Sequence, residues 1–375
     1  MIPVNEPVIS PQAKANVREA LDTGWLSSAG PFVTRFEQDF ARFLGVRHAV
    51  AVANGTAALH VALLALGIGP GDEVIVPAFT MASSWMAVLY TGAKPVFVDC
   101  ELDTYNLNPA LIAKAVTPRT KAIMPVHIYG HPVDMDPVLT TAKKLGLKVI
   151  EDAAEAHGAE YKGRLTGTMS DIACFSFYAN KIVTTGEGGM LVTDNAALAH
   201  AARKYMDLYH SDAKRFIHEK LGFNFRLTNL QAAVGVGELA NIKRYLAKKI
   251  RMAKKYANGL KNIPGITLPP RRPWAKNVYW MYAIRVDPAK FGLTKDELRI
   301  QLKDRGIDSR DFFYPPDSQP VLAELGVKLG SYPVCRLVSE TGLYLPSGLA
   351  ITDAQIAQVC QAIREVHKHA RKIRA

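Results

Sequence analysis

The chain has 375 residues, of which 49% are hydrophobic and 21% charged, and 46 Lys and Arg against 34 Asp and Glu give a net charge of +12. This composition is typical of a soluble globular protein, and the length exceeds one ordinary core, so we expect two domains. Part of the basic excess lies in residues 243–255 and 363–375, where helical spacing of apolar residues indicates solvated helix faces. The alternative interpretation of these basic residues is that they attract an anionic partner. Because no nucleic-acid motif accompanies the charge, a phosphorylated small molecule is favoured over nucleic acid.

The cysteines and the N-terminus restrict where the protein works. The four cysteines are far apart and form no CxxC pair, which indicates reduced thiols and argues against a disulfide framework or a zinc site. The N-terminus, MIPVNEPVIS, lacks the basic and apolar regions of a signal peptide, and no apolar run is long enough to cross a bilayer. We therefore expect a soluble, cytoplasmic protein without a membrane or nucleic-acid partner.

The first part of the chain alternates helices with short apolar strands. Helices are expected at 11–21, capped by Ser10, and at 33–44. A strand at 48–53 leads through Asn54-Gly55-Thr56 into a helix at 57–66. The remaining elements are strands at 74–77, 94–98, 121–126 and 148–150, a helix that ends at 90 and a helix at 136–145. This alternation predicts an α/β domain with a mostly parallel sheet.

Two more apolar strands, 172–177 and 190–192, and a helix that runs to about 209 continue this pattern. A long helix is expected at 231–260, and we place a domain boundary inside it near Asn241. The predicted domains are thus 1–240, which includes an N-terminal lead-in, and a smaller C-terminal domain, 241–375. The second domain has a predicted strand at 279–286, helices at 294–305 and 353–372, and a proline-rich loop at 312–320.

Lys181 is the first candidate for chemistry. It follows the strand at 172–177 and precedes a Gly-rich turn, 184–189, in a neighbourhood with few other charges. Burial lowers the pKa of an amine, and a neutral amine is a nucleophile that forms imines with carbonyl groups. The alternative interpretation is a surface lysine at the end of a strand, which is the commoner fate of a single lysine.

Other polar groups fall at strand ends, where open α/β sheets bind ligands. Asn54-Gly55-Thr56 offers free backbone N–H groups at a helix N-terminus, and Asp152 ends an apolar strand with a carboxylate that needs a cation. Each has a structural alternative as a helix cap. Together with the Ser176 hydroxyl and Lys181, they match the needs of pyridoxal 5′-phosphate (PLP), which has a phosphate, a protonated ring nitrogen and an aldehyde.

Metal binding is not expected. His127 and His131 have the spacing of two zinc ligands on a helix, but Tyr129-Gly130 and Pro132 argue against a helix there.

Longer motifs resemble a known family. The run FSFYANKIVTTGEGG, with EDAAEAHGA upstream and GFNFRLTNLQAA downstream, resembles the DegT–StrS family of PLP-dependent sugar aminotransferases. NGTAALHVALLALGIGPGDEVIVP, TPRTKAIMPVHIYG and NVYWMYAIRV are also similar to family segments, so the resemblance covers nearly the whole chain. It implies a fold type I PLP-dependent aminotransferase, with a large PLP-binding domain around a mostly parallel sheet and a smaller C-terminal α+β domain. Within the family the motifs most resemble GDP-perosamine synthases, which aminate C4 of a GDP-linked 4-keto-6-deoxy sugar in O-antigen and lipopolysaccharide biosynthesis.

The resemblance also assigns roles to residues. Lys181 would bond covalently to PLP and shuttle a proton, and Asp152 would pair with the pyridinium nitrogen. The other implied cofactor contacts are Gly55, Thr56 and Ser176 at the phosphate, Glu155 near the ring 3-hydroxyl, and Asn224, which would reach the phosphate from the other subunit of a homodimer. Glu187 and Arg226 are implied as neighbours of the substrate.

Two positions depart from the family pattern. Met81 stands where an aromatic residue usually covers the cofactor ring, and a thioether gives a softer contact. Asp317, which follows the candidate substrate contact Tyr314, replaces a histidine that lies near the substrate in perosamine synthases. Because a carboxylate would repel a diphosphate, the alternative substrate is a non-nucleotide keto sugar, such as an 8-oxo octulosonate that gives an 8-amino sugar acid.

The implied reaction is transamination with L-glutamate as the amino donor. Glutamate would convert PLP to pyridoxamine 5′-phosphate and leave as a keto acid, after which the amino group passes to the keto sugar. A dehydratase of the same family would need histidine in place of Lys181. Alternatives from other classes are a PLP-binding regulator without turnover and a basic nucleic-acid binder, which only the charge suggests.

Overall fold

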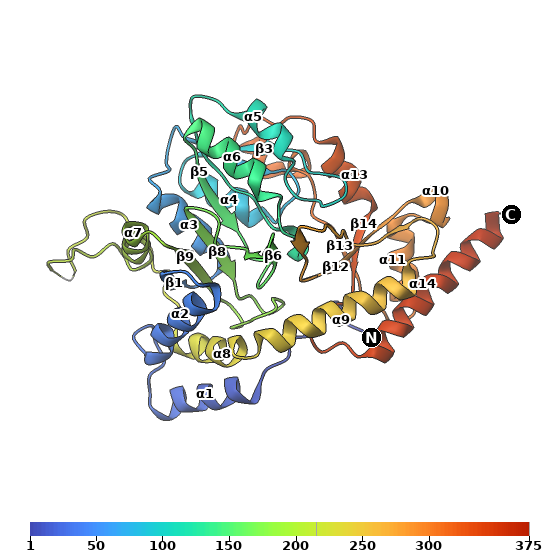
Figure 1. Ribbon diagram of the computed structural model, residues 1–375, viewed down its shortest axis with the longest axis horizontal. Coiled ribbons are helices and arrows are strands. Elements are labelled where there is room, and N and C mark those ends of the chain that lie inside the picture. Colours follow the sequence, from blue (N-terminus) through green and yellow to red (C-terminus); the bar gives the residue numbers. More distant parts are fainter. Residues whose placement is uncertain (215, 375) are drawn as a thin grey trace.

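The computed structural model describes residues 1–214 and 216–374, and its centre is a seven-stranded sheet (Figure 1). The strand order is β1-β9-β8-β5-β4-β2-β3, and every strand except β9 points the same way. The strands are β1 (His48–Val52), β2 (Glu73–Pro77), β3 (Lys94–Val98), β4 (Thr120–Ile123), β5 (Lys148–Asp152), β8 (Ile172–Ser176) and β9 (Gly189–Thr193). The predicted α/β fold with a mostly parallel sheet is confirmed.

Helices connect these strands and cover the sheet. Ser10 caps the first of them as predicted, because its Oγ accepts a hydrogen bond of 3.1 Å from the Ala13 N–H. The helices are α1 (Pro11–Asp22), α2 (Pro31–Leu44), α3 (Gly55–Ala65), α4 (Ala82–Tyr90), α5 (Ile112–Ala115), α6 (Met135–Leu145), α7 (Ala196–Met206) and α8 (Asn229–Leu239). Two short 3₁₀ helices, η1 (Pro109–Leu111) and η2 (Ile128–Gly130), lie in the connections.

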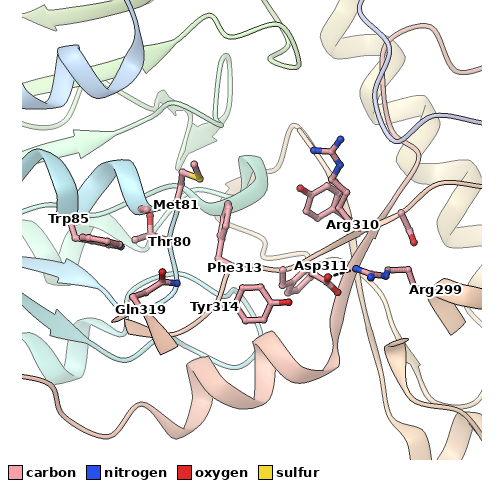
Figure 2. Close-up of a pocket in the computed structure, with 13 residues that line it drawn as sticks. Thr80, Met81, Trp85, Arg299, Arg310, Asp311, Phe313, Tyr314 and Gln319 are labelled. Atoms are coloured by element: carbon pink, nitrogen blue, oxygen red, sulfur yellow. Dashed lines mark hydrogen bonds and ion pairs between the residues drawn. The ribbon is translucent and has the colours of Figure 1, made fainter. Parts of the chain in front are cut away.

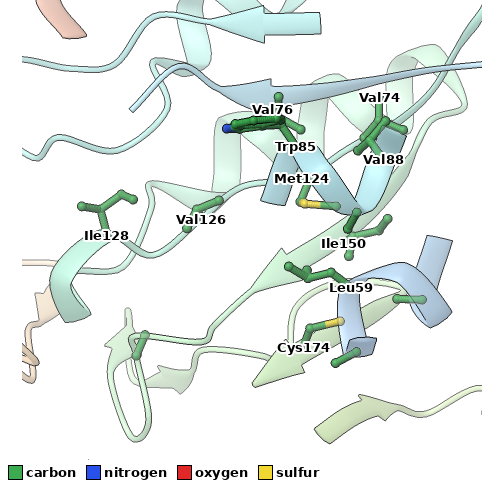
Figure 3. Close-up of a cluster of buried hydrophobic side chains, with 14 of the residues drawn as sticks. Leu59, Val74, Val76, Trp85, Val88, Met124, Val126, Ile128, Ile150 and Cys174 are labelled. Carbon is green, nitrogen blue, oxygen red and sulfur yellow. The ribbon is translucent and has the colours of Figure 1, made fainter. Parts of the chain in front are cut away.

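Both faces of the sheet are buried, because successive side chains of a strand point to opposite sides. Val74 and Val76 of β2 pack with Leu59 of α3 and Val88 of α4 (Figure 3), whereas Ile75 between them packs with α6. Helices α3, α4 and α7 thus cover one face, and α2, α6 and α8 cover the other. Burial on both faces explains why the strands are nearly continuous apolar runs.

The C-terminal part has a second sheet and its own core. Its four antiparallel strands are arranged as β10-β12-β14-β13, and α9, α11 and α14 pack against them. The elements are α9 (Ile242–Leu260), β10 (Ile266–Thr267), β11 (Ala275–Lys276), β12 (Tyr282–Val286), α10 (Pro288–Phe291), α11 (Lys295–Lys303), β13 (Arg310–Asp311), η3 (Pro316–Ser318), α12 (Pro320–Glu324), α13 (Pro333–Thr341), β14 (Gly342–Leu345) and α14 (Asp353–Arg374). Strand β11 instead pairs with β6 (Glu160–Tyr161), which also pairs with β7 (Arg164–Leu165).

The single helix predicted at 231–260 is wrong, because the chain breaks between α8 and α9. At the break the Asn241 side chain donates a hydrogen bond of 2.9 Å to the Gly237 carbonyl. Asparagine side chains compete in this way with the backbone bonds of a continuing helix. The domain boundary that we place near Asn241 coincides with the break and stays a prediction.

The strand predicted at 279–286 is also too long. Tyr279 has a φ of +52°, in the left-handed region that an extended strand does not use, and β12 starts only at Tyr282. This turn aims the intervening residues, Trp280 and Met281, toward the central sheet, where both join its core cluster.

Among the described residues, no helix has the length and apolar character to cross a bilayer, and no group of three or more His, Cys, Asp or Glu side chains is placed to hold a metal ion. His127 instead bonds Glu151 through Nε2, at 3.1 Å, and accepts the Val133 N–H at Nδ1. Because Nδ1 accepts, this network assigns the proton of a neutral ring to Nε2.

His157 makes the fold sensitive to acid. Its ring lies near the rings of Phe175 and Phe177, with centroids 5.4 and 5.3 Å away, and burial lowers its pKa to about 3. The unfolded chain protonates a histidine near pH 6.5, so the free energy of unfolding falls as the pH drops from about 6.5 toward 3. At pH 5 this single group costs about 2 kcal/mol.

Replacing this side chain (His157→Phe) should therefore remove that cost. Urea unfolding at about pH 7.5 and pH 5 should show a loss of stability that is about 2 kcal/mol smaller in the variant than in the unmodified protein. The matched control is His369→Gln, at an exposed histidine. Equal losses in all three proteins would contradict this prediction.

Candidate active site

Two adjoining cavities open at the carboxyl edge of the central sheet, one of about 680 Å³ and one of about 420 Å³. Their linings share four residues, Met81, Arg310, Phe313 and Tyr344. Figure 2 shows the smaller cavity, with Met81 and Trp85 on one side and the ion pair of Asp311 with Arg299 on the other. The two cavities are neighbouring parts of one site, which the central sheet and the C-terminal part build together.

The larger cavity gathers most of the residues predicted to contact a cofactor. Those that line it are Gly55, Thr56, Met81, Asp152, Glu155, Ser176 and Lys181, together with Glu187 from the Gly-rich turn. Asp152 and Ser176 are the last residues of the neighbouring strands β5 and β8, so the parallel sheet itself brings them to one edge.

One end of the larger cavity is suited to an anion. Asn54 caps α3 by accepting the Ala57 N–H at 2.8 Å, and the first turn of a helix leaves N–H groups without helical acceptors. Gly55 packs so closely on Ser176 that an added Cβ would lie 2.8 Å from the serine Cβ. Gly189 of β9 is equally confined, with the Asn54 carbonyl oxygen 2.3 Å from the place of its Cβ. These contacts hold the N–H groups of the turn against the Ser176 hydroxyl.

Asp152 is a buried carboxylate that forms no ion pair with any described residue, although the charge of Lys181 in the same cavity lowers its pKa. Burial raises its pKa, and the Ser84 hydroxyl, which donates to Oδ2 at 2.8 Å, counteracts that effect together with the Ala154 N–H at 3.2 Å. Two hydrogen bonds from neutral groups compensate a buried charge only in part. The site therefore favours a ligand that brings a positive charge to Asp152.

Lys181 lies in the loop that joins the antiparallel strands β8 and β9. The loop is closed by the Phe177 N–H, which donates to the Gly188 carbonyl at 2.8 Å. Burial lowers the pKa of Lys181, while the carboxylates of Glu155 and Asp152 raise it. Burial thus favours the neutral form of the amine, which is the nucleophilic one, and the two carboxylates favour its charged form.

Glu155 is the acidic neighbour of Lys181. Its Oε2 accepts the Tyr129 N–H at 2.6 Å, and burial raises its pKa to about 7, against the opposing effect of Lys181. The charge of each group thus affects the pKa of the other, which suits the pair to holding and moving a proton.

The predicted substrate contacts are only partly in the site. Tyr314 lines the smaller cavity and is half-exposed, but Asp317 lines neither cavity. Asp317 instead forms an ion pair with Arg336 of α13. This pair neutralises the charge that was expected to repel a diphosphate.

Asn224 and Arg226 also lie outside both cavities of this chain. Asn224 is exposed and pairs through its backbone with Asp207, and the same aspartate forms an ion pair with Arg226. The cofactor contact predicted for Asn224 involves a second subunit, so it stays a prediction.

Sequence reasoning missed three residues of the larger site. Ser84 holds Asp152, Trp280 places its ring 3.8 Å from the Lys181 Nζ, and His60 of α3 lines the cavity. Trp280 stands in a segment that resembles the family, NVYWMYAIRV, which was the only signal. Nothing local marks Ser84, whose partner lies 68 residues further along the chain.

Comparisons with known proteins agree with this geometry. A model of the DegT/DnrJ/EryC1/StrS aminotransferase family matches residues 7–364. The chain is 42% identical to a GDP-perosamine synthase from Caulobacter vibrioides, over 97% of this chain and 98% of that protein. It is 40% identical to a dTDP-3-amino-3,4,6-trideoxy-alpha-D-glucose transaminase from Streptomyces venezuelae, over 94% of this chain and 92% of that protein.

A solved structure, that of DesV from S. venezuelae, has the same fold. It superposes with a TM-score of 0.89 at 38% identity, over 96% of this chain and 99% of that chain. The match extends across both sheets, and so across both walls of the two cavities. The chain therefore belongs to the DegT/DnrJ/EryC1/StrS aminotransferase family, and it is a PLP-dependent sugar aminotransferase.

Proposed function

We propose that this enzyme transfers an amino group from L-glutamate to a nucleotide-linked keto sugar, with a GDP-linked 4-keto-6-deoxy sugar as the foremost candidate. The observation that carries the proposal is that the Lys181 amine and the buried Asp152 carboxylate, which would be stabilised by a cation, line the same cavity. The relatives that act on nucleotide sugars by name support the substrate class.

The residues that are present fit PLP. The turn at Gly55 and Thr56 would hold the phosphate together with Ser176. Gly55 lacks a side chain, so the backbone of this turn packs closely against that serine. Asp152 would face the ring nitrogen, and Met81 would cover the ring. When bound, PLP supplies an aldehyde for reversible bonding to amines and a protonated ring that withdraws electrons.

The protein groups do the remaining work. The Lys181 Nζ would provide the amine that holds the cofactor covalently, and when free it would take up and give back a proton at that atom. Glu155, fixed by the Tyr129 N–H, would hold a proton beside that amine. The negative charge of Asp152 would favour a protonated ring nitrogen.

The structure also weakens the reason for the alternative substrate. The alternative substrate, a non-nucleotide keto sugar such as an 8-oxo octulosonate, rests on the repulsion between the Asp317 carboxylate and a diphosphate. The ion pair with Arg336 offsets that negative charge. Arg310, which lines both cavities, adds a cation suited to a diphosphate. These contacts favour the nucleotide-linked substrate.

We also propose that two subunits form a homodimer in the cytoplasm and share their sites, with Asn224 reaching the phosphate from the other subunit. Support comes from the segment around Asn224, which exposes large apolar side chains. Leu221 is 82% exposed and Ile217 is 51% exposed, and burial against a second copy would remove both from water.

Lys181→Ala should abolish turnover, with a loss of at least about 1000-fold in kcat, because no other amine would bond the cofactor or move the proton. Keto-acid release from glutamate, coupled to a dehydrogenase, measures this. Lys14→Ala, on the exposed side of α1, is the control and should keep full activity. An active Lys181→Ala enzyme would contradict the assigned role.

Asp152→Asn should have opposite effects on stability and activity. Without cofactor, the amide removes a buried charge and should raise the free energy of unfolding by about 1 kcal/mol, while keeping the bond to Ser84. With PLP, it should lower kcat by about 100-fold or more, because the ring nitrogen loses its counter-charge. Thermal melts with and without PLP, beside the coupled assay, test both effects. A variant that is destabilised in both forms would contradict this account.

A panel of keto sugars with glutamate tests the substrate. We expect GDP-4-keto-6-deoxy-mannose to give a kcat/KM at least about 10-fold above that of a dTDP-linked keto sugar. Amination of the 8-oxo octulosonate alone would establish the alternative substrate. Consumption of glutamate without amination of any sugar would favour a PLP-binding regulator.

A further inference from the structure

Trp280 lies directly against Lys181. The lysine Nζ is 3.8 Å from the centroid of the indole ring, and the ring N–H donates a hydrogen bond of 2.9 Å to the carbonyl of Asn180, the residue before the lysine. Trp280 is only 6% exposed. The ring is therefore tied at its edge to the same loop whose amine it covers with its face.

Lys249 of α9 bonds the backbone of Trp280. Its Nζ donates to the Trp280 carbonyl at 2.9 Å and to the carbonyl of Ser347, just beyond β14. The side chain is 2% exposed, and among the described residues no carboxylate forms an ion pair with it. Burial without such a partner lowers its pKa to about 7. A buried amine with only carbonyl acceptors costs stability. We therefore expect the role of Lys249 to lie in the two backbone segments that it joins, at Trp280 and Ser347.

These contacts meet in one place, because Asn180, Lys181, Lys249 and Trp280 line a single small cavity of about 10 Å³. The fixed elements are α9 and the end of β14, which belong to the C-terminal part. The lysine loop belongs to the central sheet. Trp280 is thus the physical link between the rigid C-terminal wall of the site and the amine.

We propose that Trp280 is a positioning residue, whose ring holds the protonated amine of Lys181 beside the cofactor whenever the lysine is not bonded to it, and that Lys249 fixes the backbone from which the ring extends. The inference rests on the proposed role of Lys181. An aromatic face attracts an ammonium group and so stabilises the charged form of a lysine, more strongly where water is excluded.

The ring acts among other charges that face the amine. These groups are Asp152, Glu155 and Glu187 among the carboxylates, His157, and the cations Arg310 and Lys249. Asp152 and Glu155 also favour the charged lysine, but they line only the larger cavity, whereas the ring lines both the larger and the small cavity together with the amine. Trp280 therefore gives the amine a resting place from which it returns to the cofactor with its proton.

Fluorinated tryptophan at position 280 tests this without changing the shape of the core. Fluorine withdraws electron density from the ring face, so each added fluorine weakens the attraction for a cation. The pH midpoint of Lys181 is measured in the cofactor-free full-length protein by competitive acetylation and peptide mass spectrometry. We expect the midpoint to fall stepwise, by about 0.5 to 1 pH unit for the tetrafluoro ring.

Controls separate the ring from its surroundings. The same fluorinated residues at Trp274, which packs 5.4 Å from the Tyr161 ring, should leave the Lys181 midpoint unchanged. An unchanged midpoint across the series at position 280 overturns the proposal. If Lys181→Ala keeps its turnover, the proposed function fails instead, so the two failures are distinguishable.

The role of Lys249 has its own readout. With a single fluorine on Trp280, the ¹⁹F resonance should be one narrow line in the parent protein and should broaden or double in Lys249→Met, because the Trp280 backbone loses its anchor and the ring then takes more than one position. Lys261→Met, at the exposed residue that directly follows α9, is the matched control. An unchanged line in Lys249→Met overturns the anchoring role of this lysine.

Discussion

A buried carboxylate that forms no ion pair with any described residue organises this site. Asp152 ends a central strand, and the hydrogen-bond donors that its carboxylate meets in the described part of the chain, Ser84 and Ala154, are neutral. Desolvation of a carboxylate costs more than two such bonds return, so the fold keeps an unmet demand for positive charge at one point. In the proposed function, the protonated ring nitrogen of PLP would meet that demand. The amine of Lys181 lines the same cavity, so we expect one electrostatic imbalance to set both the orientation of the cofactor and the place of the reaction.

The two parts of the chain contribute differently to the site. Residues at the edge of the central sheet supply the groups suited to the cofactor, while the C-terminal part supplies walls such as Arg310, Phe313 and Tyr344. The smaller cavity lies almost entirely between α4 and that C-terminal wall. We therefore expect differences in sugar specificity to arise from substitutions in the C-terminal wall, while the groups suited to PLP stay the same. Loops on a fixed scaffold commonly divide the work in this way.

Local patterns predicted much of the fold and of the cofactor site. Asn54 is a cap residue before an apolar helix, and Asp152 and Lys181 follow apolar strands, so sequence periodicity placed each at a sheet edge. The element ends at Asn241 and Tyr279 were missed for local reasons, whereas the failures at the site share another cause, which is contact between distant residues. Asp317 looks like a free charge until Arg336 folds against it, and Lys249 looks like one more cation on an amphipathic helix until the carbonyl groups of Trp280 and Ser347 surround it. The one signal within α9 is helical spacing, because Lys249 falls between Tyr245 and Met252 on the buried apolar stripe, and the sequence interpretation did not use it.

The one antiparallel strand of the central sheet has a consequence for assembly. Because β9 pairs with β8, the loop that bears Lys181 is the connection of a hairpin, and its closure involves only residues 177–188. Short loops close at small entropic cost and early in folding, whereas Gly55, Asp152 and Trp280 reach the lysine only through contacts across long stretches of chain. We therefore expect the amine to reach its place in the hairpin before the groups around it. In that order of folding, the burial that lowers the pKa of Lys181 comes only with the complete fold.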